Sequence, residues 1–492
     1  MAREESQVLS RGDFGRALHR FLQASLAQAP PEEPEVARRL REHVGVERLV
    51  ELPILTRTFG AFDHPNLQVA LDRLLAGGAW SAEILGLRSR HAVYGDESLG
   101  QIVLLAGAEA LESGLGLTIA ALEHVTVSLG PDESIACMAN ALLLLRSGER
   151  AVAALISRND ERMGGAAVRL DVLAADRADG ERLLGEIEAL MREHNVYRGR
   201  VVAFGGDRYE GTVLTVHALP AVERGAIVLP DGALERIERH ALGPMRHRER
   251  LLAAGRHLKR GLLLYGPPGT GKTLTAMYLI ARMPGRTTVL LTGQGLGLIA
   301  EGCALARALQ PATVVLEDVD LVAREREYDE EAGGPVLFEL LNQMDGLAED
   351  ADVLFLLTTN RPDVLEPALA ARPGRIDQAV ELPLPDATQL TRLIQLYARG
   401  LTLRIGRLDE LVERLQGASP AHVKELLRKA ALLAAEDHEG AIVVDDRHLD
   451  AAMDELVIVG SDVRASVFGP APGPADFPFP ADSDADEDGE TA

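Results

Sequence analysis

The sequence predicts a chain built around a parallel α/β sheet, with a mixed α+β region before the sheet and a helical region after it. Four short apolar runs are separated by segments with helical spacing: "GLLLYG" (261–266), "TTVLLTG" (287–293), "TVVLE" (313–317) and "DVLFLLTTN" (352–360). Apolar strands that alternate with helices are typical of a parallel sheet with both faces covered. From residue 386 to 456 the apolar residues keep a helical spacing, which predicts a purely helical region.

The region from about 35 to 225 mixes helices and strands. The runs "AVAALIS" (151–157) and "AVRLDVLA" (167–174) predict strands, residues 178–194 predict a helix, and "GRVVAFG" and "GTVLTVHAL" predict two further strands. An earlier helical pattern lies within residues 1–28. No cluster of catalytic residue types stands out here, so we expect an α+β domain that serves recognition rather than catalysis.

Composition constrains the cellular setting and the partners. The chain has 492 residues and a net charge of −24, which disfavours nucleic acid as a partner unless a local basic patch overrides it. Its two cysteines, Cys137 and Cys303, lie far apart without metal-ligand spacing, which suits a reducing compartment. No apolar run reaches the ~18 residues of a membrane-spanning helix, and the start "MAREESQVLS" lacks a signal-peptide pattern. We therefore expect a cytoplasmic protein without a membrane span.

The strongest motif lies in "LLLYGPPGTGKTLTA", between a predicted strand and a predicted helix. It consists of Gly266, Pro267, Pro268, Gly269, Thr270, Gly271, Lys272 and Thr273. This fits G-x-x-x-x-G-K-[ST] in its required context, which a chance glycine-rich turn would lack. Backbone N–H groups of such a loop wrap the β- and γ-phosphates of ATP at the positive end of the helix. Lys272, one of only four lysines, supplies a compact charge, and the Thr273 hydroxyl can ligate Mg²⁺. We assign ATP binding to Gly266 through Leu274.

Several segments make the chain resemble a known family. "LLLYGPPGTGKT" is similar to the Walker A element of the AAA ATPases, "PATVVLEDVD" to their Walker B segment, "NQMDGL" (342–347) to the end of their intersubunit-signalling helix, and "LLTTNRPDVLEPALAARPGRIDQAVELPLPD" (356–386) to their second region of homology. The resemblance covers roughly residues 226–456, and its last match sets the chain apart from kinases and GTPases. It implies a phosphate-loop parallel sheet with a helical lid, ATP hydrolysis with Mg²⁺, and a homo-oligomeric ring, expected to be a hexamer.

The patterns and the resemblance together predict four parts. These are an N-terminal α+β domain at 1–225 that recognises a protein substrate or adaptor, a large α/β nucleotide-binding domain at 226–385, a helical lid at 386–457, and a Pro-rich acidic tail at 458–492. From Asp476 onward the tail carries seven acids and no base. We expect this segment to be disordered, because it cannot bury enough apolar surface to fold.

The resemblance also implies roles for single residues. Asn360 matches the polar sensor that holds the attacking water, and Arg372 and Arg375 match the arginine fingers that complete the neighbouring subunit's site. A cation on the transferred phosphoryl group is worth roughly 10³–10⁵ in rate in related systems. As isolated residues, the two arginines would fit an exposed turn with ordinary surface charge equally well. "GASPAHVKELL" aligns with the lid motif, where Ala421 replaces the arginine of other branches.

The Walker B acids stand in a reversed order. In most of the family Asp precedes Glu, whereas here Glu317 precedes Asp318. Successive side chains on a strand point to opposite faces, so by position Glu317 is the catalytic acid that helps to hold the metal and Asp318 is the one that polarises the attacking water. A similar order occurs in the mitochondrial AAA translocase of the Rieske iron–sulfur protein. We expect a working site with adjusted geometry; the alternative is a pseudo-ATPase or nucleotide-gated scaffold with little turnover.

The segment that grips polypeptide in threading rings departs from the family pattern. "LTGQGLGLIAEG" (291–302) has no aromatic residue and is several residues short. Leu296, Leu298 and Ile299 are its apolar candidates, and plain core positions explain them equally well. We expect a ring ATPase that remodels protein partners at its face rather than one that unfolds them processively. Remodelling of nucleic acid is a less favoured alternative.

Overall fold

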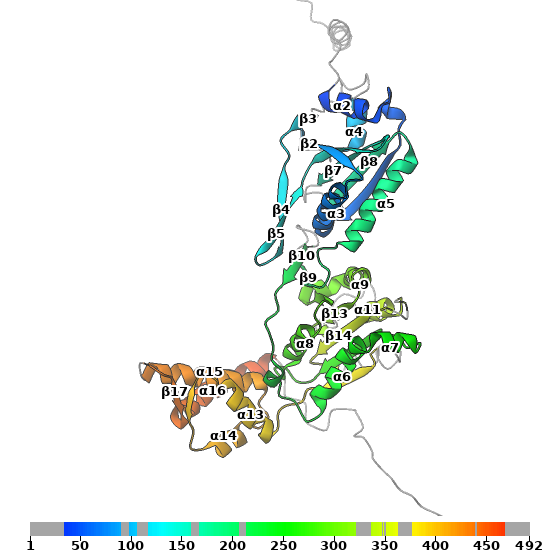
Figure 1. The fold of residues 1–492 in the computed structure, drawn as a ribbon. Coiled ribbons are helices and arrows are strands. Elements are labelled where there is room, and N and C mark those ends of the chain that lie inside the picture. The colour runs from blue at the N-terminus through cyan, green and yellow to red at the C-terminus, as the bar shows by residue number, and fades with distance from the viewer. Residues whose placement is uncertain are drawn as a thin grey trace, which may run out of the picture.

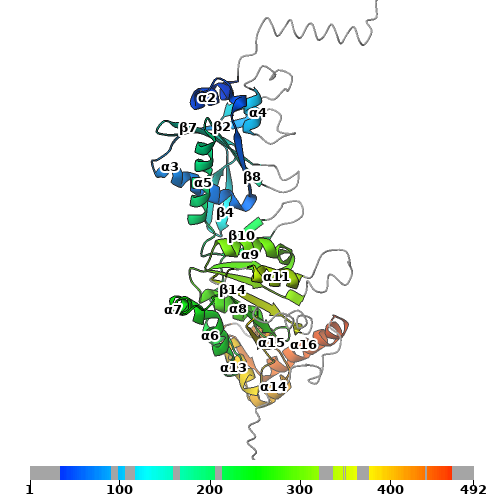
Figure 2. The ribbon, with the colours of Figure 1, turned by 90° about the vertical axis from the view of Figure 1, so that its right-hand side faces the viewer.

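The computed structural model describes residues 34–89, 98–105, 117–158, 167–205, 213–320, 336–346, 348, 351–362, 376–437 and 440–467. Figure 1 shows an elongated molecule in which an N-terminal domain, a central α/β domain and a helical lid follow one another. In Figure 2 the N-terminal domain lies above the central domain and the lid lies below it. The expected helix within 1–28 and residues 468–492 of the expected tail lie outside the described residues, whereas residues 458–467, which we assigned to the tail, continue a helix of the lid. None of the described helices has the length and apolarity needed to cross a lipid bilayer.

The N-terminal domain is an antiparallel sheet covered by helices on both faces. Its strands run in the order β1-β8-β7-β6-β2-β3, and their bounds in that order are Ile54–Gly60, Ala167–Ala174, Arg150–Arg158, Ala141–Ser147, Ser81–Ser89 and Leu117–Ala120. One face is covered by α3 (His64–Ala76) and α5 (Arg177–Glu193), and the other by α2 (Glu35–Val44) and α4 (Leu99–Leu105). Two 3₁₀ turns, η1 (Leu49–Glu51) and η2 (Ala61–Asp63), follow α2 and β1. The strands predicted at 151–157 and 167–174 and the helix at 178–194 correspond to β7, β8 and α5.

Strand β7 explains why this domain contains continuous apolar runs. Val152 and Ile156 enter the core under α3 and α5, whereas Ala153 and Leu155 enter the core under α2 and α4. Because helices cover both faces of the sheet, the side chains in the middle of β7 are exposed to solvent on neither face. This part of the strand is therefore a continuous apolar run instead of an alternation of apolar and polar residues.

A hairpin of the N-terminal domain reaches the central domain. Its strands are β4 (His124–Gly130) and β5 (Glu133–Met138). Leu129, near the tip, is buried in a core of the central domain. Arg200, just before β9, donates to the two carboxylate oxygens of Glu133 at 2.7 and 2.9 Å and to the backbone oxygen of Leu129 at 2.8 Å. Side-chain contacts as well as the chain itself therefore join the two domains.

The central domain holds a seven-stranded sheet in the order β10-β9-β12-β13-β14-β11-β15. The strand bounds in that order are Val213–His217, Val201–Gly205, Thr287–Leu291, Ala312–Leu316, Val353–Thr359, Arg260–Tyr265 and Gln378–Glu381. All neighbouring strands are parallel except β10, which is antiparallel to β9. The four apolar runs predicted as strands are β11, β12, β13 and β14, which lie side by side. The predicted α/β fold class is confirmed.

Strands β9 and β10 differ from the domain division that we expected. We placed "GRVVAFG" and "GTVLTVHAL" in an N-terminal domain ending at residue 225, whereas β9 pairs with β12 and carries β10 with it. Phe204 of β9 packs in the same core as Leu291 and meets Phe62 of the N-terminal domain edge-on, with ring centroids 6.2 Å apart. A local pattern identifies a strand but not the sheet that it joins, because pairing depends on cross-strand contacts distant in sequence.

Helices cover both faces of the central sheet. One face is covered by α6 (Ala233–Arg246), which is followed directly by α7 (Arg248–Ala253), and by α8 (Lys272–Ala281). The other is covered by α9 (Ile299–Ala308) and α11 (Val336–Asp345). Along β14, Phe355 enters the core under α9 and α11, while Leu354 and Leu356 enter the opposite core.

The lid contains four described helices and a small sheet. The helices share one apolar core and are α13 (Ala387–Tyr397), α14 (Leu408–Arg414), α15 (Pro420–Asp437) and α16 (Asp446–Val467). Asp386 and Gln389 form a reciprocal capping box at the start of α13. Two three-residue strands, β16 (Thr402–Arg404) and β17 (Val443–Asp445), pair in parallel. Our expectation of a purely helical region was therefore wrong at these two points, because strands this short carry no readable period.

Candidate functional site

The phosphate-loop motif forms the turn between β11 and α8. Gly266 has a φ of 141°, and a Cβ added there would lie 2.3 Å from the backbone oxygen of Leu382, so the position requires glycine. Gly271, with a φ of 99°, directly precedes α8. The Thr270 hydroxyl donates to the backbone oxygen of Pro267 at 2.9 Å and holds the turn. The loop therefore ends at the positive end of a helix, an arrangement that favours bound phosphate.

Lys272 is buried and turned onto its own loop. Its Nζ donates to the backbone oxygens of Gly266 at 2.8 Å and Pro267 at 2.9 Å. Burial lowers the pKa of Lys272 to about 8, while the charges of Asp318 and Asp320 act in the opposite direction. Neutral carbonyls hold the ammonium group where charged phosphate oxygens would be stronger partners.

Two acids directly follow β13 and have different partners. Burial raises the pKa of the Glu317 carboxyl group, and the neighbouring Thr273 side chain opposes this rise. Asp318 Oδ1 accepts a hydrogen bond from Asn360 Nδ2 at 3.2 Å. The backbone of Asp318 has a φ of 50°, in the left-handed region that Asp tolerates better than most residues. Its N–H donates to Thr358 Oγ1 at 3.1 Å.

Asp320 holds the backbone on which Asn360 sits. Its side chain is buried, and Oδ1 accepts from Thr359 Oγ1 at 2.8 Å and from the Asn360 N–H at 3.1 Å. The end of β14 is thereby fixed against the segment that follows β13. Asn360 consequently contacts one acid through its backbone and another through its side chain.

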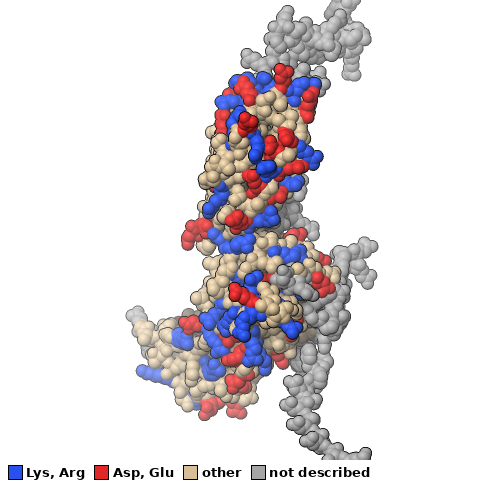
Figure 3. Space-filling view, turned by 45° about the vertical axis from the view of Figure 1, so that its right-hand side comes forward, with Lys and Arg blue, Asp and Glu red and all other residues tan. Residues whose placement is uncertain are grey.

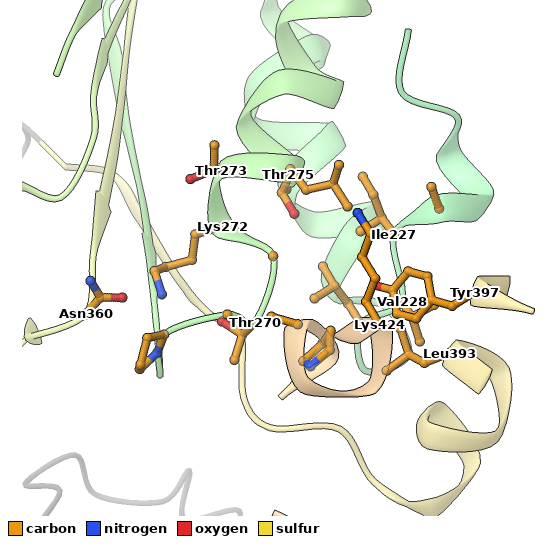
Figure 4. A pocket seen from close by; sticks show the side chains of 18 of the residues that line it. Ile227, Val228, Thr270, Lys272, Thr273, Thr275, Asn360, Leu393, Tyr397 and Lys424 are labelled. Atoms are coloured by element: carbon orange, nitrogen blue, oxygen red, sulfur yellow. The ribbon is translucent and has the colours of Figure 1, made fainter. Parts of the chain in front are cut away.

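A cavity of about 440 Å³ lies between the phosphate loop and the lid (Figure 4). Its lining comes from Ala226–Leu229, Pro268–Thr275, Asp318, Asn360, Leu393, Tyr397, Pro420, Ala421 and Lys424. In Figure 4, Lys272 and Asn360 lie at one end, and Val228, Leu393 and Tyr397 lie at the other together with Lys424. A polar end suits phosphates, and a largely apolar end suits an aromatic base.

The lid closes directly onto the phosphate loop. The backbone N–H of Ala421 donates to the backbone oxygen of Gly269 at 3.2 Å. A Cβ added at Gly269 would lie 2.7 Å from Ser419 Oγ and 2.9 Å from the Ala421 Cβ, and the φ of Gly269 is 79°. Any side chain at position 269 would therefore separate the lid from the loop.

Residues 226–229 join the central domain to the lid. They begin at the last residue of the 3₁₀ turn η4 (Arg224–Ala226). Ile227 and Leu229 pack into the core under α6 and α8, whereas Val228 packs into the lid core. Ile227 is extended, with φ −99° and ψ 115°, so neighbouring side chains point to opposite sides. The segment that anchors both bodies also lines the cavity.

The structure brings most of the predicted site residues together. Pro268 through Leu274, Asp318 and Asn360 line the cavity. Gly266 and Pro267 contact Lys272 through their backbone oxygens, and Glu317 contacts Thr273. Arg372 and Arg375 lie outside the described residues.

The apolar candidates for a polypeptide grip belong largely to the core. Leu296 and Ile299 are 1% and 2% exposed and pack with Phe204, while Leu298 is half-buried. They lie on the 3₁₀ turn η5 (Gly293–Leu298) and at the start of α9. Core packing therefore accounts for Leu296 and Ile299, the interpretation that the sequence left open.

Sequence reasoning missed several residues of the site. Asp320 could have been found, because it stands two residues after Asp318 in the same acidic run. Lys424 carried a usable signal as well, since lysine is rare in this chain and lies here inside the lid motif. Nothing local marks Val228 or Tyr397 as cavity residues, because their position depends on packing between distant segments.

Comparisons with known proteins match this arrangement. Residues 262–384 match the family described as "ATPase family associated with various cellular activities (AAA)". The chain is 30% identical over 312 residues to a proteasome-activating nucleotidase of Thermococcus onnurineus, an alignment that covers 56% of this chain and 77% of that protein. It is 33% identical over 234 residues to the proteasome-activating nucleotidase of Thermococcus kodakarensis, covering 45% of this chain and 57% of the relative. It is 32% identical over 237 residues to the 26S protease regulatory subunit 6A of Caenorhabditis elegans, covering 46% and 54%. The chain thus spans little more than half the length of the last two relatives.

Proposed function

The chain belongs to the AAA family of ATPases, and we propose that it binds ATP in the cavity between the central domain and the lid and hydrolyses it there. The observation that carries this proposal is that the two adjacent acids have separate partners. Glu317 contacts Thr273 of the phosphate loop, and Asp318 contacts Asn360 at the neighbouring strand end. This separation supports two different chemical roles for the acids.

Binding would use the phosphate loop from Gly266 to Leu274. Backbone N–H groups and Lys272 would contact the β- and γ-phosphates, and Lys272 would exchange two carbonyl partners for charged oxygens. The adenine ring would pack against Val228, Leu393 and Tyr397 at the apolar end of the cavity.

The metal and water roles would fall to different acids. The Thr273 hydroxyl and the Glu317 carboxylate are the hard oxygen ligands that Mg²⁺ prefers, and a cation beside Glu317 would offset the effect of burial on its pKa. When bound, Mg²⁺ would neutralise charge on the phosphates. Asp318 would polarise the attacking water, and Asn360, held by Asp320, would orient the Asp318 carboxylate.

Single substitutions test this assignment. Asp318→Asn should bind ATP normally and hydrolyse it about 10²–10⁴-fold more slowly, since the group that accepts the proton is lost. Glu317→Gln should instead raise the Mg²⁺ concentration needed for half-maximal turnover. Nucleotide binding and steady-state phosphate release at several Mg²⁺ concentrations would separate the two effects. The opposite pattern, with an ATP-trapped Glu317→Gln and an active Asp318→Asn, would refute the assignment.

Arg372 and Arg375 are proposed to act in the neighbouring subunit of a ring. Replacing either arginine with Ala should leave ATP binding nearly intact and depress hydrolysis. Mixing such a variant with Lys272→Ala should restore some activity, because each variant contributes one intact half to a shared site. Mixed rings that contain both variants and show no recovery would argue against a shared site.

The alternative is a nucleotide-gated scaffold with little turnover, which the reversed order of Glu317 and Asp318 keeps open. Both readings predict ATP binding, so binding does not separate them. A steady-state rate for the wild-type protein that Asp318→Asn abolishes supports an enzyme. Equal, very slow rates for both proteins would support the scaffold.

We propose that the ring remodels a protein partner recognised mainly by the N-terminal domain. The segment after β12 has no aromatic residue, and its Leu296 and Ile299 are buried. Both facts support weak or absent unfolding of a stable, tagged fluorescent protein at saturating ATP. Rapid ATP-dependent loss of fluorescence that Leu298→Ala abolishes would overturn this view. The printed names of the relatives connect those proteins to the proteasome, and we extend to this chain only action on protein, in the cytoplasm.

A further inference from the structure

A basic surface lies apart from the ATP site. Residues 236–260 contain eight Lys or Arg residues and two acids, in a chain whose net charge is −24. Exposed arginines of α6, α7 and the following turn define what we call the α6–α7 basic surface: Arg236, Arg239, Arg246, Arg250 and Arg256. In Figure 3, Lys and Arg side chains gather on the central domain, on the side that carries α7 in Figure 1.

The periodicity of α6 creates part of this surface. Ile237 and Ala241 are buried against the sheet. Arg239 and Arg246 lie seven residues apart, about two helical turns, and therefore project from the same side, away from that apolar stripe. The surface is thus a property of a rigid helix that packs directly on the sheet.

These arginines lack acidic partners in the part of the chain that the structure describes. Elsewhere, exposed arginines commonly pair with acids, as in Arg38–Glu42 at 3.1 Å and Arg177–Glu181 at 2.7 Å. No ion pair between described residues involves any of the five arginines of the α6–α7 basic surface. Within the described structure these exposed charges are not neutralised by an ion pair.

Buried charge beneath the surface adds to its positive potential. Asp352 lies between two buried guanidinium groups, with its Oδ1 2.7 Å from Arg286 Nη2 and 3.6 Å from Arg260 Nη1. Arg248, at the surface, places its Nε 3.4 Å from Asp352 Oδ2. Asp352 thus faces three arginines, while Asp377 also acts on the charge of Arg260. Arg260 Nε, Arg286 Nη1 and Asp352 Oδ1 have no hydrogen-bond partner within the described structure.

The chain itself carries an anion of matching character. Residues 476–492 contain seven acids and no base. The tail begins after α16 of the lid, and α6 begins four residues after Leu229, at the junction with the lid. Residues 468–487 can span up to about 70 Å when fully extended, which is ample for contact with a helix of the adjoining domain.

We infer that the acidic tail, residues 476–492, binds the α6–α7 basic surface in the assembled protein. Attraction between seven carboxylates and the exposed guanidinium groups would supply the affinity, and salt would weaken it because most of these charges are exposed. The interaction does not require ATP hydrolysis. It would cover the one strongly basic stretch described here in an acidic protein and so oppose binding of nucleic acid.

The scarcity of lysine makes a direct test in the full-length chain possible. Carbodiimide joins amines to neighbouring carboxylates, and the chain has only four lysines. We expect Arg246→Lys/Arg250→Lys to form cross-links from positions 246 and 250 to acids of the tail, detected by peptide mass spectrometry. The cross-links should be lost in 1 M salt, where the Debye length is about 3 Å.

Arg73→Lys/Arg182→Lys is the matched control, because both positions are exposed arginines of the N-terminal domain. Tail cross-links that are absent or much weaker in this control support the inference. Equal tail cross-linking in both variants, or none at positions 246 and 250, overturns it. A second result would also overturn the inference: full-length protein binds duplex DNA at low salt, and Arg246→Glu/Arg250→Glu removes that binding. In this case no cross-link to the tail would form. That result would assign the surface to nucleic acid.

Discussion

Two carboxylates in this molecule, the buried Asp171 and the half-buried Asp318, have opposite surroundings. Asp171, on β8 of the N-terminal sheet, accepts hydrogen bonds from Thr56 Oγ1 at 2.7 Å, the Leu99 N–H at 3.0 Å and Arg169 Nε at 2.8 Å. Asp318, after β13 of the central sheet, accepts a bond from Asn360 and borders the cavity. Asp171 has its partners within the fold, whereas Asp318 faces space that a ligand can fill.

The topology of the two sheets explains the difference. Asp171 lies within a strand of an antiparallel sheet whose two faces are covered by helices, so its charge must be balanced by neighbouring side chains and backbone. Asp318 lies where parallel strands end together at one edge, beyond which the loops leave a crevice. Position relative to the strand ends therefore decides both how deeply each acid is buried and whether it is available for chemistry.

The largest expected effect is at the phosphate loop. Lys272→Ala should abolish measurable ATP binding. Lys272 Nζ contacts the backbone oxygens of Gly266 and Pro267, and no other described cation occupies this position in the phosphate loop. Titration with a fluorescent ATP analogue measures this. Lys429→Ala is the control, since Lys429 pairs with Glu455 in the lid at 2.8 Å and is absent from the cavity lining. Normal affinity in Lys272→Ala would contradict the assigned site.

Asp171→Ala should act on stability instead of chemistry. Loss of a buried acceptor with three donors should lower the free energy of unfolding of the N-terminal domain by about 3 kcal/mol. Trp80, the only tryptophan, is buried in this domain and donates to Glu186 at 2.8 Å, so its fluorescence reports the transition during denaturant titration. ATP turnover of the folded protein should be unchanged.

Glu188→Ala provides the matched comparison for Asp171→Ala. Glu188 pairs with Arg57 at 3.0 Å on the surface of the same domain, and such exposed pairs contribute less than about 1 kcal/mol. A similar loss of stability in both variants would show that the hydrogen bonds to Asp171 contribute no more to the free energy of unfolding than an exposed ion pair does.

Gly269→Ala tests the contact between the lid and the phosphate loop. The added methyl group must displace Ser419 and Ala421, and the positive φ adds strain, together about 1–3 kcal/mol. We expect ATP affinity to fall about tenfold or more with little change in the folded content. Gly243→Ala on α6 should leave affinity unaltered, because nothing lies within 4 Å of a Cβ at that position.

The smallest expected effect is a pH dependence of ATP binding. Because the pKa of Lys272 is lowered to about 8 in the free protein, the lysine is mostly charged below pH 8 and loses its proton as the pH rises. Phosphate favours the charged form, so ATP affinity should decline above pH 8 and binding should take up protons there. In the free protein, burial of the charged lysine lowers stability below pH 8, and this penalty disappears as the pH rises towards 10.5. Calorimetry in buffers of different ionisation enthalpy would detect the proton uptake. An ATP affinity that does not change from pH 7 to 9.5 would argue against a role for Lys272 protonation in ATP binding.

The sequence predicts the central domain better than its surroundings. The runs that became β11 to β14 are apolar because each strand is covered on both faces, and the loop from Gly266 to Thr273 follows from rules on backbone and charge. The sheet membership of β9, the short strands β16 and β17, and the cavity contacts of Val228 and Tyr397 could not be read in this way. Each of these features depends on a contact with a segment that is distant in the sequence. The local spacing of apolar residues contains no information about such contacts.

The hairpin contact through Leu129 and Arg200 has a mechanical consequence. Because Leu129 at the tip of the hairpin is buried in the central domain and Met138 at its base packs in the core of the N-terminal domain, the two domains should rotate together. If the central domain rotates about its junction with the lid at residues 226–229, the N-terminal domain would rotate with it. A small tilt of the central domain during nucleotide turnover would become a much larger sweep at the far end of the N-terminal domain, near α2. A protein bound near α2 would then be displaced, although it lies far from the nucleotide.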